Sequence, residues 1–255
     1  MSMLRIENVT KQFGGLAAIR DVSLEIRRGE LSGLIGPNGA GKTTLLNVIS
    51  GFYHASSGRI LYEGQDRTHL RPYDVAALGI ARTFQNVALF KGMSVLDNIM
   101  TGRLLKMRGN VLLDAVYWGP AKKQELEHRA VVERIIAFLE IEAIRKTPAG
   151  RLPYGLQKRV ELARALAAEP TLLLLDEPMA GMNVEEKEDM CRFILDVRDE
   201  FGTTIALIEH DMSVVMDISD RVVVLDYGRK IADGTPDEVR ADRAVLDAYL
   251  GVAHA

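Results

Sequence analysis

The chain has 255 residues, of which 26% are charged and 47% hydrophobic, and its formal net charge at pH 7 is −3. This composition is typical of a globular protein with one large core or two unequal subdomains, and it excludes a disordered chain. Because there is no excess of positive charge, we expect no nucleic-acid partner. The apolar runs are far shorter than the roughly 20 residues that span a bilayer, so we expect any membrane role to depend on a partner.

The N-terminal part of the chain has the pattern of β-strands. Within residues 1–30, hydrophobic residues recur at every second position, at Leu4, Ile6, Val22, Leu24 and Ile26. This period predicts strands with one buried face. Residues 31–36 predict a buried strand, residues 42–52 the helix that follows it, and residues 57–65 a short strand pair.

A glycine-rich segment lies between that predicted strand and helix. Residues 36–43 read GPNGAGKT and match the G-x-x-x-x-G-K-[ST] pattern at each fixed position. Backbone N–H groups and the positive end of the helix dipole surround phosphates in such a loop, so the alternative of a turn without a ligand is weaker. Lys42 is predicted to meet the β- and γ-phosphates and the Thr43 hydroxyl to ligate Mg²⁺. The predicted ATP-binding residues are Gly36, Pro37, Asn38, Gly39, Ala40, Gly41, Lys42, Thr43 and Thr44.

The middle of the chain has a helical pattern, from about residue 95 to residue 168. One apolar stripe consists of Val131, Val132, Ile135, Ile136 and Leu139. Residues 108–125 contain glycine, proline and Trp118, and we expect them to form a packed excursion of this helical part. Strands are predicted again at 171–178, 203–211 and 220–234.

Two acidic residues follow a run of four leucines. Asp176 and Glu177 come at the carboxyl end of this predicted parallel strand, where α/β sheets place their ligands. Asp176 is predicted to reach Mg²⁺ through water, and Glu177 to act as the general base, or the polariser, for the attacking water. The alternative is a polar strand end without function. His210 follows another apolar strand, so its imidazole is predicted beside the γ-phosphate, with a purely structural histidine as the alternative.

The order of these motifs resembles the ATP-binding subunit of an ABC transporter over nearly the whole chain. The resemblance implies one ABC ATPase domain over residues 1–255, with a P-loop NTPase (RecA-like) α/β core. This core, with an N-terminal antiparallel β region, would comprise 1–90 and 165–255, and an inserted α-helical subdomain at 91–164 would carry the signature motif.

The resemblance also gives roles to two further residues. In the family, a glutamine after the antiparallel region links the γ-phosphate and Mg²⁺ to the membrane partner, and Gln85 in the segment ARTFQ matches it. Gln85 is therefore expected to bind both ATP and the metal. Phe13 matches the aromatic residue that stacks on adenine, because stacking needs only a π-face. A place in the hydrophobic core is the alternative for Phe13.

The family signature, L-S-G-G-Q, opens a helix that faces the ATP held by the other subunit. The matching residues here are Leu152, Pro153, Tyr154, Gly155, Leu156 and Gln157. Pro153 replaces a serine hydroxyl that contacts the γ-phosphate, and one such hydrogen bond contributes about 1.5–3 kcal/mol. The helix N-terminus keeps its N–H groups, including that of Gly155, so we expect a weakened but working signature. The alternative is a helix that faces no ligand.

A second departure concerns the loop that crosses between subunits in the family. Asn183 replaces the usual aspartate there, which keeps an acceptor but removes a charge. This substitution predicts softer coupling between the two ATP sites.

Several segments resemble the larger ATPase subunit of branched-chain amino-acid importers. They are the LPYG variant, EPMAGMN, RTFQNVALFKGMSVLDNI, the excursion around Trp118 and the ending VLDAYLG. This resemblance implies an ATP-hydrolysing subunit that works as a sandwich dimer, as a homo- or heterodimer with a second ATP-binding subunit. Its other partners would be integral membrane permease subunits, docked near residues 85–90, and indirectly a solute-binding protein. It would lie as a peripheral protein on the cytoplasmic face of a prokaryotic inner membrane.

Three alternatives remain open from the sequence. The first is the ATPase of an ABC transporter for another solute, such as urea, an amide or a lipid. The second is a non-transport ABC ATPase that acts on chromosomes, DNA or ribosomes. The third is a regulatory nucleotide-binding module with little turnover, which Pro153 and Asn183 would favour but Glu177 and His210 oppose.

Overall fold

The computed structural model describes residues 2–107 and 120–250, and by compactness the chain divides into two units. The first unit comprises Met1–Arg82, Thr171–Glu177 and Ile194–Ala255, and the second comprises Thr83–Pro170 and Pro178–Phe193. Residues 108–119 of the predicted excursion, Trp118 included, lie outside the described residues, and residues 120–125 belong to α5 (Pro120–Phe138). The subdomain limits at residues 91 and 164 stay predictions. No helix in the described ranges is both long and apolar enough to cross a membrane.

The first unit contains an antiparallel sheet with the strand order β2–β1–β4–β5. Its strands are β1 (Ser2–Phe13), β2 (Leu16–Arg27), β4 (Ser57–Tyr62) and β5 (Gln65–Asp66). The period-two residues of the sequence are buried, as Leu4, Ile6 and Val22 show. The strands predicted within residues 1–30 and 57–65 are therefore confirmed.

The same unit contains a six-stranded sheet with the order β10–β9–β3–β8–β7–β6. All of its neighbouring strands run parallel except β9 and β10, which are antiparallel. Five of the strands lie in the segments predicted as strands, with β9 and β10 both in 220–234, and β6 was not predicted. The strands are β3 (Leu31–Ile35), β6 (Ile80–Arg82), β7 (Leu172–Asp176), β8 (Thr204–Ile208), β9 (Arg221–Asp226) and β10 (Arg229–Gly234).

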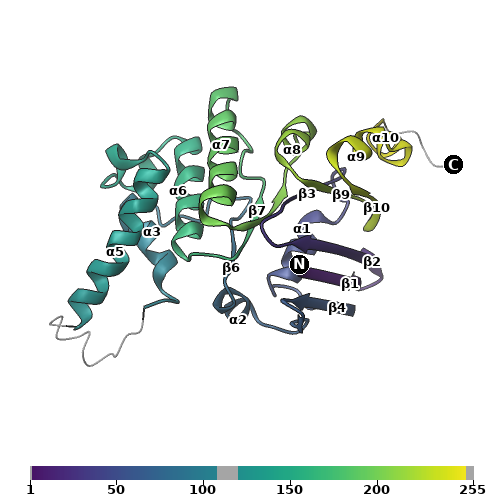
Figure 1. The fold of residues 1–255 in the computed structure, drawn as a ribbon, viewed down its shortest axis with the longest axis horizontal. Helices are drawn as coiled ribbons and strands as arrows, with labels where there is room; N and C mark the ends of the chain where they lie inside the picture. The colour runs from purple at the N-terminus through teal and green to yellow at the C-terminus, as the bar shows by residue number, and fades with distance from the viewer. Residues whose placement is uncertain (1, 108–119, 251–255) are drawn as a thin grey trace. The chain divides into compact units, whose positions relative to one another are not determined.

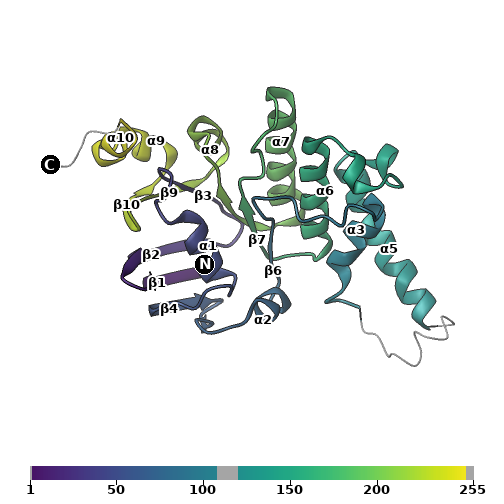
Figure 2. The same cartoon turned by 180° about the vertical axis from the view of Figure 1, so that it is seen from behind.

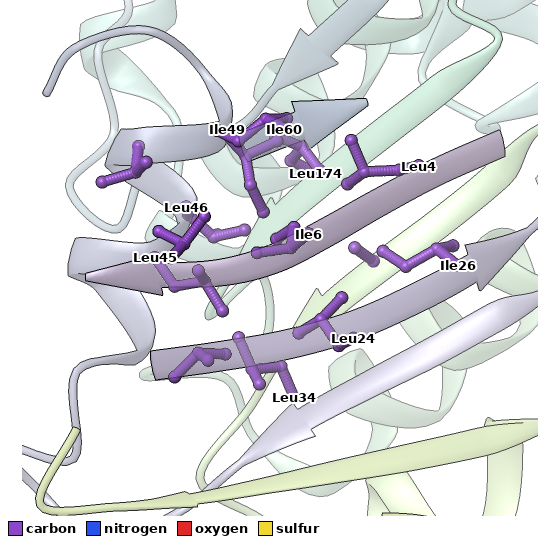
Figure 3. Close-up of a cluster of buried hydrophobic side chains, with 14 of the residues drawn as sticks. Leu4, Ile6, Leu24, Ile26, Leu34, Leu45, Leu46, Ile49, Ile60 and Leu174 are labelled. Carbon is purple, nitrogen blue, oxygen red and sulfur yellow. The ribbon is translucent and has the colours of Figure 1, made fainter. Parts of the chain in front are cut away.

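Helix α1 (Lys42–Ile49) packs between the two sheets, and α2 (Pro72–Ala77) precedes β6. Figure 3 shows Leu45 and Leu46 of α1 among Ile6 of β1, Leu24 of β2 and Leu34 of β3. Burying this apolar surface stabilises the unit, because each such side chain contributes about 1.5–3 kcal/mol. The N-terminus of α1 is thereby fixed at the end of β3.

The other face of the six-stranded sheet is covered by α8 (Met212–Ile218), α9 (Pro236–Ala241) and α10 (Arg243–Leu250) (Figures 1 and 2). Strand β9 alternates between the two faces. Val223 and Leu225 belong to the cluster around α1, whereas Val222 and Val224 pack in the cluster of α8 and α9. This alternation is the period expected of a strand buried on both sides.

The second unit is helical. It contains α3 (Val95–Met100), α5 (Pro120–Phe138) and α6 (Tyr154–Ala167), with the 3₁₀ turns η1 (Thr101–Arg103), η2 (Glu142–Ile144) and η3 (Ala149–Arg151). Helix α7 (Val184–Phe201) begins in this unit and ends in the first. In the predicted stripe on α5, Val132 and Ile136 are fully buried and Val131 is half-buried. The helical pattern predicted for residues 95–168 is confirmed for the part of that region that the structure describes.

Candidate nucleotide-binding site

The loop between β3 and α1 has a backbone that only glycines adopt without strain. Gly36, Gly39 and Gly41 have φ angles of 150°, 81° and 99°. A Cβ on Gly36 would lie 2.1 Å from the carbonyl oxygen of Leu225, and one on Gly41 would lie 2.6 Å from that of Ala18. The first N–H groups of α1 have no side-chain cap from Gly41, so they remain suited to an anion.

Lys42 is buried within this loop. Its Nζ donates to the carbonyl oxygens of Gly36 (2.7 Å) and Pro37 (3.0 Å). Burial lowers the pKa of Lys42, while the charges of Glu177 and Asp176 oppose that shift. The charges of the two predicted acids, Asp176 and Glu177, therefore favour the protonated form of Lys42. Thr43 is exposed and Thr44 is half-buried at the start of α1.

Asp176 is the last residue of β7 and is only 1% exposed. Its Oδ2 accepts a hydrogen bond from Nη2 of Arg82 at 2.7 Å. Nη1 of Arg82 donates to Asn47 Oδ1 of α1 (2.7 Å) and to Oγ of Ser50 (3.0 Å), the residue that follows α1. Arg82 comes from the parallel neighbour β6, paired in register with Leu174. Sequence reasoning missed Arg82, because only the pairing of β6 with β7 brings it to Asp176.

Glu177 follows β7 in a left-handed backbone conformation, with φ 52°. Its N–H donates to the carbonyl oxygen of Ile208 (2.9 Å), which extends the pairing of β7 with β8 by one residue. His210 Nε2 lies 2.6 Å from Glu177 Oε1, so an Nε2–H donates to a carboxylate whose side chain is 7% exposed. The left-handed backbone of Glu177 costs about 1–3 kcal/mol. The structure thus brings the two predicted catalytic side chains together.

Phe13 lies at the end of β1 and is 43% exposed, which rules out the alternative of a core residue. Its ring meets that of Tyr53 edge-on, with centroids 5.1 Å apart. Lys11 Nζ lies 4.9 Å from the centre of the Phe13 ring. An exposed aromatic face held in this way is available for stacking.

The predicted signature residues begin α6 in the second unit. Pro153 is the N-cap and Tyr154 the first helical residue, and both are exposed. Gln157 Nε2 donates to the carbonyl oxygen of Leu152 (2.8 Å), which closes the turn, and Leu156 is half-buried. The loss of a side-chain donor at residue 153 follows directly from proline.

Gly155 is buried against a carboxylate that sequence reasoning missed. A Cβ on Gly155 would lie 2.3 Å from Glu186 Oε1 of α7. Glu186 also accepts from the N–H of Asn183 (3.1 Å) and donates its own N–H to Asn183 Oδ1 (2.9 Å), a reciprocal cap at the start of α7. Glu186 therefore connects the residue that replaces the family's aspartate to the signature helix.

The oxygen atoms and the glycine-rich loop of the first unit fit a nucleotide bound together with Mg²⁺. Mg²⁺ prefers oxygen ligands and usually keeps one or two protein oxygens beside phosphates and water. A hydroxyl at Thr43 and a carboxylate at Asp176 are such oxygens, next to a glycine-lined cradle for phosphates. Gln85, the third predicted metal ligand, lies in the second unit with an exposed side chain.

Comparison with known proteins agrees with this geometry. Residues 19–180 match the ABC transporter family, and residues 229–255 match the branched-chain amino acid ATP-binding cassette transporter family. The chain belongs to the ABC transporter family. Membership makes it a nucleotide-binding, ATP-hydrolysing transport subunit, as the sequence predicted.

Curated relatives match this ABC ATPase over nearly its whole length. It is 38% identical over 251 residues to BraF of Pseudomonas aeruginosa, with 98% of each chain covered. It is 40% identical over 254 residues to LivG of Escherichia coli, again with 98% of each chain covered. Both relatives are named high-affinity branched-chain amino acid transport ATP-binding proteins.

Solved structures confirm the P-loop NTPase fold of the ABC ATPase. A nucleotide-free ATP-binding cassette from an ABC transporter has a TM-score of 0.85 and 34% identity, with 98% of this chain and 99% of that chain covered. An ATP-binding cassette in its ADP conformation gives the same values.

Proposed function

We propose that this ABC ATPase binds ATP with Mg²⁺ and hydrolyses it to energise the import of branched-chain amino acids across the cytoplasmic membrane. The names of BraF and LivG and the match of residues 229–255 support this cargo. The observation that carries the hydrolytic part is the contact of Glu177 with His210, 2.6 Å apart at the end of the sheet that also bears Asp176.

In this proposal the loop 36–44 binds the phosphates of ATP. The backbone N–H groups of the loop bind the phosphates, Lys42 exchanges its carbonyl partners for the β- and γ-phosphates, and Phe13 stacks on adenine. Thr43, Gln85 and, through water, Asp176 would hold Mg²⁺. When bound, the metal neutralises the phosphate charge.

Proton transfer depends on Glu177 and His210, which follow strands β7 and β8. The Glu177 carboxylate accepts the proton of the attacking water, and the Nε2–H of His210 holds that carboxylate in one orientation. General-base catalysis of this kind contributes about 10²–10⁴-fold to the rate.

The signature residues 152–157 act on the ATP of a second ATP-binding subunit, either another copy of this chain or a related one. We assign the whole chain, 1–255, to one ABC ATPase domain with its helical subdomain at 91–164. Permease subunits dock near residues 85–90, where Phe90 is 55% exposed, and a solute-binding protein delivers the cargo to them. The chain then lies as a peripheral protein on the cytoplasmic face of the membrane.

The hydrolytic part is tested with Glu177→Gln, with Glu188→Gln as the control because Glu188 is exposed on α7. We expect Glu177→Gln to bind ATP, to hydrolyse it at least about 10²-fold more slowly and to shift to a dimer with ATP on a sizing column. The control should hydrolyse at the wild-type rate. A Glu177→Gln protein with undiminished hydrolysis would refute the role of Glu177.

The cargo is tested by uptake of labelled leucine in cells that lack this gene. We expect uptake to fall, and to be restored by the wild-type gene but not by Glu177→Gln. If the deletion leaves the uptake of leucine, isoleucine and valine unchanged, the proposed cargo is wrong even when the purified protein hydrolyses ATP.

A further inference from the structure

The segment from Phe84 to Ala88, which contains Gln85, has no regular secondary structure. Its backbone polar groups find partners on α6. Lys158 Nζ donates to the carbonyl oxygens of Gln85 (2.7 Å) and Phe84 (3.3 Å), and Arg164 Nη1 donates to that of Ala88 (2.6 Å). In the opposite sense, the N–H of Phe84 donates to Glu161 Oε1 (3.3 Å). The signature helix thus supplies the hydrogen bonds that a neighbouring strand would supply in a sheet.

The three side chains lie three residues apart along α6 and therefore on one side of the helix. Lys158 is 3% exposed and Glu161 is 1% exposed. Burial raises the pKa of Glu161, against the opposing effects of Lys158, the Phe84 N–H and Arg164. Burying charge in this way costs free energy unless each group is well paired. Apolar contacts alone would be sufficient to pack α6 against its neighbours. The buried charged groups therefore indicate that the backbone of residues 84–88 must be held in one position.

The side chain of Gln85 is exposed, whereas its carbonyl group is held by a buried ammonium group. A long side chain reaches a defined point only when its backbone is fixed. We infer that Lys158, Glu161 and Arg164 are positioning residues that fix the backbone of residues 84–88 and thereby place the Gln85 side chain for its ligand.

The contacts also connect two parts of the proposed function. The signature residues open α6, and Lys158 follows them in the next turn. When the nucleotide of a second subunit contacts the start of α6, the Lys158 side chain therefore connects that contact to the backbone of Gln85. This inference rests on the proposed roles of Gln85 and of the signature.

The variants Lys158→Met and Lys158→Arg test the inference, with Arg159→Met as a matched control. Arg159 lies on the same helix, but it binds Asp189 (2.9 Å) and packs on Phe193 instead of reaching residues 84–88. Amide hydrogen exchange of residues 84–88 is measured in each purified protein together with its melting temperature. We expect faster exchange, by at least about tenfold, in Lys158→Met only, because a held amide exchanges through local opening.

The second measurement is a double-mutant cycle on the ATPase rate. We expect Lys158→Met to lower kcat by about tenfold, but by less than twofold when Gln85→Ala is already present, because both changes remove the same placement. Arg159→Met should act equally in both backgrounds, and Lys158→Arg should restore most of the rate. A purely structural role of Lys158 would give independent, multiplicative losses.

Unchanged exchange at residues 84–88 in Lys158→Met, or multiplicative losses in the cycle, would overturn the inference. Absence of hydrolysis in the wild-type protein would instead overturn the proposed function, while the exchange measurement would still decide whether α6 holds this segment.

Discussion

The buried ion pair of Arg82 with Asp176 gives the sharpest test of the first unit. The two side chains are 7% and 1% exposed, and their charged atoms are 2.7 Å apart. Arg82 also donates hydrogen bonds to Asn47 of α1 and to Ser50, the residue that follows α1. The change Arg82→Met keeps the bulk of the side chain but leaves a buried carboxylate without its guanidinium. Breaking such a pair costs about 3–5 kcal/mol.

This loss is large enough to measure easily. At about 2–4 °C per kcal/mol for a chain of this size, the melting temperature of Arg82→Met should fall by about 6–20 °C. Urea unfolding, followed by circular dichroism, gives the free energy itself. Arg71→Met is the control, because Arg71 pairs with Asp74 on the surface with a side chain that is 76% exposed. Arg71→Met should leave the free energy of unfolding almost unchanged, because an exposed ion pair contributes little to stability.

The double variant Arg82→Met with Asp176→Asn separates charge from packing. Because the amide removes the buried charge, the double variant should be more stable than Arg82→Met alone. If Arg82→Met costs less than about 1 kcal/mol, or if Asp176→Asn brings no recovery, the electrostatic account of this pair is wrong.

Two further predictions concern the phosphate loop. The variant Lys42→Met should lose ATP binding yet be more stable to urea than wild type at pH 7.5, because burial lowers the pKa of Lys42 and so disfavours its charged form. Between that lowered pKa and 10.5, the unfolded state binds more protons than the folded state, so the free energy of unfolding of the wild type should rise with pH. The difference in stability between Lys42→Met and wild type should therefore shrink toward pH 10. A pH-independent difference would contradict this explanation. The variant Gly36→Ala should lose more stability than Gly39→Ala, whose Cβ meets no atom within 4 Å and whose cost should be the backbone term of about 1–2 kcal/mol. If both variants lose the same free energy of unfolding in urea, the close contact between the added Cβ and the carbonyl oxygen of Leu225 is relieved in Gly36→Ala.

Local patterns in the sequence were sufficient for most of the elements. The alternation at Leu4 and Ile6 and the apolar run before Asp176 predicted strands that the structure contains. Strand β6 was missed because three residues carry no periodicity, and only pairing with β7 makes them a strand. The short helix α2 was missed as well.

The candidate site, too, was predicted from the sequence only in part. Its loop, acids and histidine were found from contiguous motifs, because each motif combines a strand end or helix start with the side chains beside it. The contact of His210 with Glu177 was not predicted, since the sequence placed the imidazole beside the phosphate. The functional roles of these residues, like those of Gln85 and the signature residues, remain predictions.

The sequence by itself determined the family, most of the strands and helices along the chain and the position of the phosphate loop, because short-range patterns encode them. Only the tertiary structure decided that Arg82 holds Asp176, that Glu161 holds the backbone of Phe84 and that Glu186 lies against Gly155. These contacts join residues far apart in the chain, and no local propensity specifies them. They form where the packing of strands and helices leaves a buried charge or backbone group that requires a partner.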